Sequence, residues 1–468
     1  MSKSTVDYDE QSYEDWYESQ NFEKHSESTL KKMDEEIRLK VEKELKTLIV
    51  MDPTEYMLYH KYAEIQDWLP TQNMSHINWV KRLIWKMDNK SDFRRIEPEL
   101  IFVGNEIEVK TKNIWGQESS IELENKEPFM KHWTIMRTLI SSGRNDGTIG
   151  RQIRFIVRDK NTKQYLGVIC LSSSMAMLKP RNDAIGWDID KNFQKGGKLG
   201  CLANGQSIIP TQPFGSAFLG GKLLSLLCLS DVVQNKWKEL YKEPLIQVDT
   251  TSLWGEMKGG QSQYDNLNPY WDSKLGDTTG QTPLKPRDEV FFSMRDWMKI
   301  REPLEYWRHF VEKGESGNLR MREHKSRAIN YCYRKLGFKS KDFISEQKRG
   351  VYRAQLYKNG DQFLRDEINV GELIPAHDFS VEAITEFWRF GSMGDTTKLD
   401  KQTLEKLGDN EKKIKMKKRM KGMVKGQVDS WRPETIIQNQ GSSSDWYLSM
   451  GSLTWQETRK RFLDQVGR

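Results

Sequence analysis

The feature that most constrains the fold is a strand, a glycine-containing turn, a helix and a second strand between residues 207 and 249. An apolar strand is predicted at 207–211, the turn at 212–217, an apolar helix after the turn and a buried strand at 245–249. Small residues let the backbone of such a turn approach a ligand, and N–H groups at a helix start bind anions. The turn therefore favours a phosphate site, although the same pattern suits a helix that only needs a turn before it.

A second segment, residues 327–338, has apolar positions at helical spacing and a glycine, Gly337, that is typical of a helix end. Phe338 then precedes a predicted strand at 350–357. With the first motif, this segment resembles the GNAT superfamily of acyl-CoA-dependent N-acyltransferases. The signature of that family is Gln/Arg-x-x-Gly-x-Gly/Ala, then a strand, then a helix ending in Tyr-x-Lys-Leu-Gly-Phe.

The GNAT resemblance implies a mixed α/β (α+β) fold, with a GNAT-like central mixed sheet flanked by helices, an N-terminal helical unit and a large insertion. It implies acetyl-CoA or another acyl-CoA as cofactor, and Tyr333 as the group that protonates the departing thiolate, with core packing of Tyr333 as the alternative. It also implies a set of cofactor-binding residues in the turn: Gln212, Phe214, Gly215, Ser216, Ala217 and Phe218.

A longer stretch, roughly residues 127–290, resembles the DruA-like family found in a phage-defence system. The matching pieces include residues 150–157, 165–174, 179–187 and 241–251, in that family's order. The stretch is more loosely similar to Mom-type DNA-modification proteins of phages. These resemblances imply a phage-associated context and a GNAT-type fold directed at nucleobases.

An amine must lose a proton before it attacks a thioester, and a carboxylate, or a water that it orders, can serve as base. Asp249 ends the predicted strand beside the cofactor turn and is the first catalytic candidate; Asp188, after Trp187, is the second. For each, a cap or turn role is the alternative interpretation.

Composition excludes several classes of protein. The net charge is +7 and 30% of residues are charged, and no run of about 18 apolar residues exists, so no membrane partner is expected. The N-terminus lacks a secretion signal, which predicts a cytoplasmic protein, in the host cytoplasm if it is phage-encoded. The four cysteines and seven histidines have no metal-ligand spacing, so no metal is expected.

Two regions suggest DNA or RNA as a partner. The first is a basic run in the C-terminal part; the second is a Trp- and Arg-rich helix expected at 295–313. A solvated helix and an ordinary amphipathic helix are the respective alternatives. The candidate nucleic-acid-binding residues are Lys412, Lys413, Lys415, Lys417, Lys418, Trp297 and Arg301.

The chain is expected to have four parts. They are an acidic disordered arm (1–28), a helical unit with a hairpin around Gly104 (29–125), a GNAT-like core (126–358) with an insertion at 253–322, and a helical and basic C-terminal extension (359–468).

The function predicted from these features is N-acyl transfer on or near nucleic acid, with DNA base modification as one form of it. The alternative is a non-catalytic nucleic-acid-binding component of a phage or anti-phage assembly. A nuclease built on Asp183, Asp188 and Asp190 ranks third, because a nuclease needs clustered carboxylates for metal.

Overall fold

A computed structural model gives the structure of the chain. It describes residues 18, 24–86, 95–104, 111–112, 118–119, 127–144, 150–187, 198–212, 214–252, 262–278, 282–305, 325–345, 348–390 and 443–466. The chain divides into two compact units: unit 1 comprises Met1–Tyr56 and Gln281–Gln347, and unit 2 comprises Met57–Gly280 and Lys348–Arg468.

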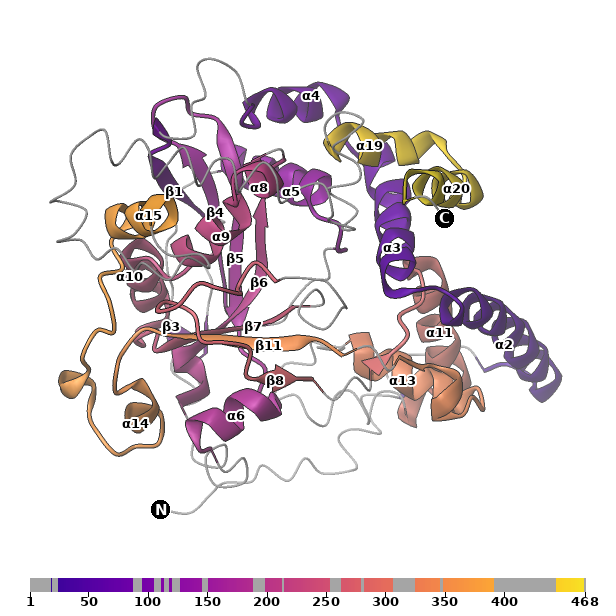
Figure 1. Ribbon diagram of the computed structural model, residues 1–468. Coiled ribbons are helices and arrows are strands. Elements are labelled where there is room, and N and C mark those ends of the chain that lie inside the picture. The colour runs from indigo at the N-terminus through magenta and orange to yellow at the C-terminus, as the bar shows by residue number, and fades with distance from the viewer. Residues whose placement is uncertain are drawn as a thin grey trace, which may run out of the picture. The chain divides into compact units, whose positions relative to one another are not determined.

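Unit 2 is built on a seven-stranded sheet (Figure 1). Its neighbours pair antiparallel except for β6 and β7, which are parallel. The prediction of a mixed α/β fold with a mixed central sheet flanked by helices is confirmed at that level. In spatial order the strands are β1 (Pro98–Val103), β4 (Gln152–Asp159), β5 (Tyr165–Ser173), β6 (Leu202–Pro210), β7 (Gln247–Ser252), β11 (Gly350–Gln355) and β8 (Gly276–Asp277).

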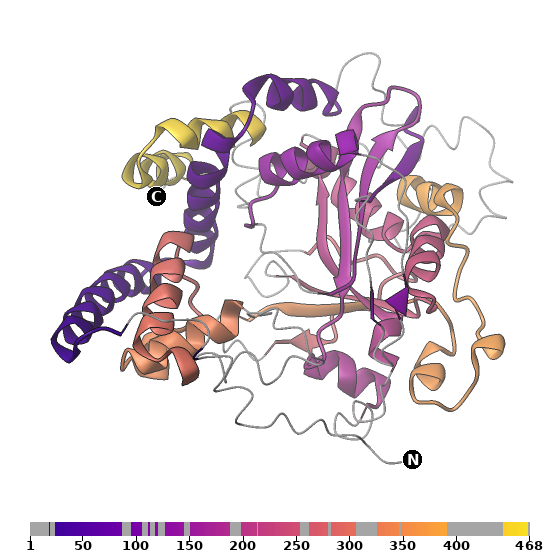
Figure 2. The same ribbon diagram turned by 180° about the vertical axis from the view of Figure 1, so that it is seen from behind.

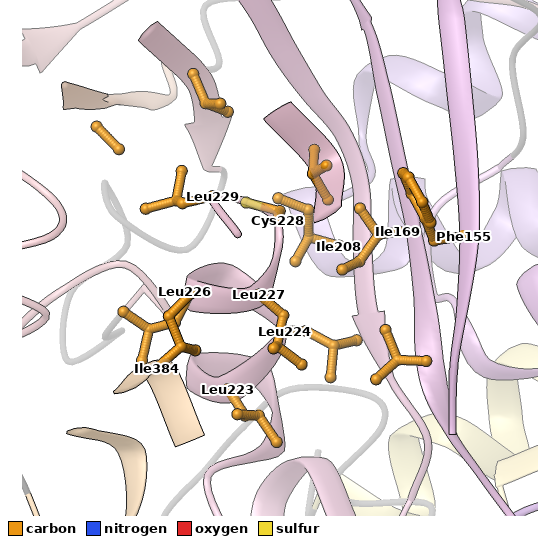
Figure 3. Close-up of a cluster of buried hydrophobic side chains, with 14 of the residues drawn as sticks. Phe155, Ile169, Ile208, Leu223, Leu224, Leu226, Leu227, Cys228, Leu229 and Ile384 are labelled. Carbon is orange, nitrogen blue, oxygen red and sulfur yellow. The ribbon is translucent and has the colours of Figure 1, made fainter. Parts of the chain in front are cut away.

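Helices cover both faces of this sheet (Figures 1 and 2). One face packs on α9 (Gly220–Leu227), α10 (Asp231–Tyr241) and α15 (Val381–Phe390). The other packs on α4 (Met74–Leu83) and α5 (Glu127–Ile140). Figure 3 shows α9 inside the first core, where Leu224 and Leu227 lie beside Ile169 and Ile208. A helix that is apolar on nearly every side, as α9 is, needs such a buried position.

The remaining helices of unit 2 lie on the margins of these cores. Most residues of α3 (Pro53–Trp68) belong to unit 2, and α3 packs with α19 (Ser443–Ser449) and α20 (Trp455–Val466) through Leu58, Tyr447 and Phe462. α6 (Lys179–Ile185) ends at Gly186, whose φ of 78° is the left-handed conformation that favours glycine at a helix end. Short helices α8 (Phe214–Ala217) and α14 (Gly360–Leu364) complete the unit.

Unit 1 contains α2 (Glu27–Ile49), α11 (Asp288–Arg301) and α13 (Lys325–Lys335), with a small sheet of β9 (Thr282–Pro283) and β10 (Ile344–Ser345). Gly337, with φ of 82°, follows α13, and the N–H of Phe338 donates to the carbonyl of Tyr333. The predicted helix stop at Gly337 is confirmed.

The segment 281–347 of unit 1 leaves unit 2 after β8 and returns to it before β11. These two strands are antiparallel neighbours, with Asp277 opposite Gly350. Two further hydrogen bonds close the pair: the N–H of Thr278 donates to the carbonyl of Arg349, and the N–H of Arg349 donates to Oγ1 of Thr278.

One local prediction was wrong, and another lies in part outside the described residues. The predicted strand at 101–103 belongs to β1, which pairs over its full length with β4, whereas residues 105–110, the other half of the hairpin expected around Gly104, lie outside the described part of the chain. A short pair, β2 (Thr111–Lys112) with β3 (Glu118–Ser119), is found farther along the chain. The helix expected at 295–313 begins earlier, at Asp288, with two acidic residues in its first turn, as a helix N-terminus favours.

Candidate functional site

The parallel pair β6–β7 is the topological exception in the sheet. The two strands pair at three positions, ending with Asn204 opposite Asp249, and helices α8, α9 and α10 connect them. Beyond that point the two backbones no longer pair. A side chain bonds to β6 instead: Oγ1 of Thr250 donates to the carbonyl of Gly205 at 3.0 Å. In open α/β sheets, ligands bind where connections diverge at the carboxyl ends of strands.

A row of polar residues crosses the sheet at this junction. Paired residues of neighbouring strands share a face, and the register aligns five of them: Gln152, Ser172, Asn204, Asp249 and Arg353. We call these five the polar row. The same face carries apolar core residues farther along the strands, among them Ile156 and Val168.

A β-bulge adds one more polar side chain, that of Gln206, beside the polar row. The β5–β6 register shifts so that Gln206 has no opposite residue between Gly205 and Ser207. Gln206 Oε1 accepts hydrogen bonds from Nε2 of Gln152 and from the thiol of Cys170. Bulges of this kind redirect a side chain and are frequent beside active sites.

Asp249 lies at the centre of the row and is fully buried. Its Oδ2 accepts hydrogen bonds from Nη1 of Arg181 at 2.7 Å and from Oγ of Ser174 at 2.5 Å. Among the described residues its Oδ1 has no hydrogen-bond partner. Burial raises the pKa of the Asp249 carboxyl above its usual value, and Arg181 and Ser174 oppose that rise. A buried carboxylate with one oxygen held and one available is a candidate proton acceptor.

The Arg181 guanidinium is committed to this carboxylate. It also donates to the carbonyls of Met175 and Ala176 and lies over the ring of Trp187. Neither the Asp249–Arg181 pair nor the polar row has a local sequence signal, because the pair depends on where α6 packs and the row depends on strand register.

The predicted cofactor turn, residues 212–217, follows β6 as expected and contains the short helix α8, but two N–H groups in it or next to it already have acceptors. The N–H of Gly215 donates to the carbonyl of Thr211 at 2.7 Å, and that of Phe218 to the carbonyl of Phe214. Phe214 is buried against Trp85 and Trp388, and Gln212 is partly buried. Ser216 and Ala217 lie in α8, and their side chains are outside the described part of the structure.

A segment of the chain itself packs against β6 and the start of α9. Nε2 of Gln263 donates to the carbonyl of Ile208 at 2.9 Å, and a Cβ on Gly221 at the start of α9 would lie 2.9 Å from Oε1 of Gln263. Lys222 donates to the carbonyl of Asp265. Gln263 thus lies between β6 and the start of α9.

Tyr333 lies in unit 1, on α13, whereas the turn lies in unit 2. Its ring is fully buried and its hydroxyl donates to the carbonyl of Leu284 at 2.9 Å. Burial raises the pKa of Tyr333 well above its usual value. This arrangement is the one expected of a core tyrosine.

Replacing Tyr333 with Phe should lower the free energy of unfolding of the full-length chain by about 1–3 kcal/mol, because the buried Leu284 carbonyl loses its donor. Chemical denaturation measures the loss. Tyr270→Phe is the control, since its hydroxyl donates to Asp378 from a less buried position and a smaller loss is expected. Unchanged stability for Tyr333→Phe would contradict the core assignment.

The candidate nucleic-acid side chains of α11 have partners within unit 1. Trp297 is buried and its Nε1 donates to Oδ1 of Asp34 at 2.9 Å, while Arg301 forms ion pairs with Asp34 and Glu27. This matches the amphipathic-helix alternative. Outside the described residues lie Asp188, Asp190 and the basic run with Lys412, Lys413, Lys415, Lys417 and Lys418.

Metal and membrane sites can be assessed only in the described residues. No group of three or more His, Cys, Asp or Glu side chains there is arranged to hold a metal ion, and Asp183 forms an exposed ion pair with Lys179. No helix in the described ranges has the length and apolar character needed to cross a bilayer.

Comparison with known families places the fold in context. The family model described as Druantia protein DruA matches residues 76–366, more than half of the chain. The chain belongs to the DruA family. The match includes the polar row, the β6–β7 junction, Arg181 and Asp249.

A curated relative is the Druantia protein DruA of Escherichia coli (strain UMEA 4076-1). It is 26% identical to this chain over 242 residues, which are 48% of this chain and 55% of the relative. The aligned part therefore spans about half of the relative's length. No solved structure matches the chain.

Proposed function

We propose that this chain is a component of a multi-protein anti-phage defence system, and that it transfers a group to an amine bound beside Asp249, as GNAT N-acyltransferases do. The DruA family membership supports the defence context. The observation that carries the chemical part is the uncommitted Oδ1 of a buried carboxylate at the point where two parallel strands diverge.

In this proposal Asp249 accepts the proton of the incoming amine, which leaves the nitrogen lone pair available for attack. Arg181 and Ser174 hold Oδ2 and keep the carboxylate ionised, so that Oδ1 faces the amine as an acceptor. Arg181 remains protonated because a guanidinium pKa lies far above neutrality. An acyl-CoA donor is part of the proposal only if Gln263 moves away from β6.

Two measurements on the full-length protein test this function. Calorimetry with a panel of CoA thioesters tests the donor, and mass spectrometry of nucleosides from DNA and RNA of expressing cells tests for an added group on an amino nitrogen. A mass increase that depends on the protein supports group transfer to nucleic acid. Unmodified nucleosides together with no thioester binding contradict it.

The second candidate is a non-catalytic component of the same assembly. The observation that favours it is the hydrogen bond of Gln263 to β6, together with the hydrogen-bonded N–H groups of Gly215 and Phe218, because these groups are then not available to a cofactor in this conformation.

Replacing Gln263 with Ala should separate the two candidates. If the Gln263 side chain closes a donor site between β6 and α9, its removal should strengthen CoA-thioester binding roughly five- to tenfold. The reason is that the hydrogen bond of Gln263 to β6, of about 1 kcal/mol, no longer competes with the ligand. Calorimetry gives the affinities. Gln234→Ala is the matched control, since Nε2 of Gln234 also donates to a backbone carbonyl, that of Leu229 at 2.7 Å on α10. No binding by either variant favours the non-catalytic component.

A further inference from the structure

Gln247 on β7 is a buried polar side chain that the fold itself does not use. It is only 1% exposed, and among the described residues neither Oε1 nor Nε2 of its carboxamide has a hydrogen-bond partner. Burial of an amide without partners costs free energy. Such a group in a folded core therefore calls for an explanation, of which a functional role is one.

The neighbours of Gln247 do not provide that explanation. Leu202, directly opposite on β6, belongs to an apolar cluster with Ile185 of α6 and with Phe363 and Leu364 of α14. A methionine of the same length would suit these surroundings without leaving an amide unpaired. Packing therefore gives no reason for a glutamine at this position.

A second unpartnered group lies two residues farther along the same strand. Asp249 and Gln247 leave β7 on the same face, about 7 Å apart along the strand. Oδ1 of Asp249 is buried and also has no hydrogen-bond partner in the described part of the chain. The two side chains together offer two acceptors, Oδ1 and Oε1, and one amide donor, Nε2.

The residues that flank this pair across the sheet are less buried. Asn204 on β6 lies opposite Asp249, and Gln355 on β11 lies opposite Gln247, and both are partly exposed. Neighbouring strands are about 5 Å apart. The buried pair is therefore one strand away from partly exposed polar side chains on either side.

We propose that Gln247 selects the substrate of the Asp249 site by pairing with an exocyclic amino group and the ring nitrogen beside it, the combination that adenine and cytosine carry. This inference rests on the proposed function, because it starts from an amine bound beside Asp249. It adds the class of amine that the site accepts and the residue that determines it.

The donors and acceptors of such a base match those of the pair. A ring amino group has two N–H bonds, one for Oε1 of Gln247 and one for Oδ1 of Asp249, while the ring nitrogen accepts from Nε2. One amino group reaches two acceptors about 5 Å apart, which suits side chains at this spacing on a strand. A glutamine carboxamide pairs with adenine in this two-bond manner in protein–DNA complexes. An aliphatic amine has no acceptor beside its nitrogen and would leave Nε2 unpaired.

Calorimetry of the full-length protein with adenosine, cytidine, inosine, uridine and n-butylamine tests the selection. Inosine and uridine carry a carbonyl where adenosine and cytidine carry the amino group, so an acceptor would face the acceptors of Gln247 and Asp249. We expect adenosine to bind about tenfold or more tightly than inosine, and cytidine than uridine, because a buried polar group is left unpaired in each weaker complex. The binding of n-butylamine should be weaker than that of adenosine and cytidine.

Gln247→Met keeps the length of the side chain and removes both amide atoms. It should weaken the binding of adenosine and cytidine roughly 10- to 100-fold, through the loss of two hydrogen bonds, and leave inosine and uridine unaffected. The midpoint of chemical denaturation should stay the same or rise, because the variant no longer buries an unpaired amide. A carboxamide with a structural role would give a lower midpoint and an unchanged preference among nucleosides.

Gln234→Met is the matched control. Gln234 lies on α10, which covers the other face of the sheet, and its Nε2 donates to the carbonyl of Leu229 at 2.7 Å. Its replacement should lower the denaturation midpoint and leave the preference among nucleosides as it is in the unaltered protein.

The proposal is overturned if the unaltered protein binds adenosine and cytidine no better than inosine and uridine, or if n-butylamine binds as well as they do. It is equally overturned if Gln247→Met keeps the preference of the unaltered protein. These measurements need neither a CoA thioester nor detection of group transfer. Binding of n-butylamine without a preference among nucleosides would remove the role of Gln247 and leave transfer to an amine standing, so the two failures are distinguishable.

Discussion

Replacing Arg181 with Met should lower the free energy of unfolding at pH 7 by about 3–5 kcal/mol. The substitution leaves Asp249 as an uncompensated charge in the interior, and breaking a buried pair by removing one partner carries a cost of this size. Both side chains are fully buried, so water does not replace the lost partner. Chemical denaturation of the full-length chain measures the effect.

The loss should be smaller at pH 5 than at pH 7. Burial already raises the pKa of Asp249, and removal of Arg181 removes the strongest influence that lowers it. The folded variant then holds its proton more tightly than the unfolded chain, so its stability falls as pH rises above the usual carboxyl range and is partly regained on acidification.

Arg158→Met is the control, since the Arg158–Glu99 pair is partly exposed and its removal should cost no more than about 1 kcal/mol. An equal loss for Arg181→Met at both pH values would contradict the assignment of the cost to an ionised Asp249.

Replacing Asp249 with Asn should slow group transfer roughly 10²–10⁴-fold, the usual contribution of a general base. An amide has nearly the same shape but does not accept the proton of an ammonium group. The rate is that of product formation, followed by mass spectrometry. Because the substitution leaves Arg181 without its carboxylate, circular dichroism at the assay temperature must first establish that the variant is folded.

Ser174→Ala gives a second readout that keeps the carboxylate. The Ser174 hydroxyl is one of the groups that lower the pKa of Asp249. Its loss should raise that pKa, so the rate of group transfer should begin to rise at a higher pH. A full rate for Asp249→Asn, or an unchanged pH profile for Ser174→Ala, would contradict the role of Asp249 as base.

The sequence predicted those parts of the fold that are encoded locally. Apolar spacing predicted β6, β7 and the helix after the turn. The position of Gly337 predicted the end of α13. The strand at 101–103 shows the limit, because its partner, β4, lies some fifty residues away and no local pattern names it.

The candidate site was predicted only in part. Asp249 was chosen from its place at a strand end, and the structure puts it in the polar row, but Gln152, Asn204 and Arg353 join it only through the register of distant strands. Arg181 reaches Asp249 from α6, and no local pattern in the sequence predicts that contact.

Tyr333 lies in a motif that resembles that of the GNAT family, but it does not belong to the same unit as the turn with which that motif was expected to act. The helix and its Tyr-x-Lys-Leu-Gly-Phe ending are present, yet the tyrosine belongs to a unit assembled from two separate stretches of chain. The order of motifs along the sequence does not reveal this division of the folded chain into two units.

The pairing of β8 with β11 has a consequence for how this chain can change in length. The segment 281–347 departs and returns through adjacent strands whose ends are joined by backbone hydrogen bonds. In the topology of the sheet, the whole segment 281–347 therefore has the place of a single hairpin connection between β8 and β11. Insertions or deletions within 281–347 alter the size of that turn and leave the register of β11 against β7, and with it the neighbourhood of Asp249, unchanged.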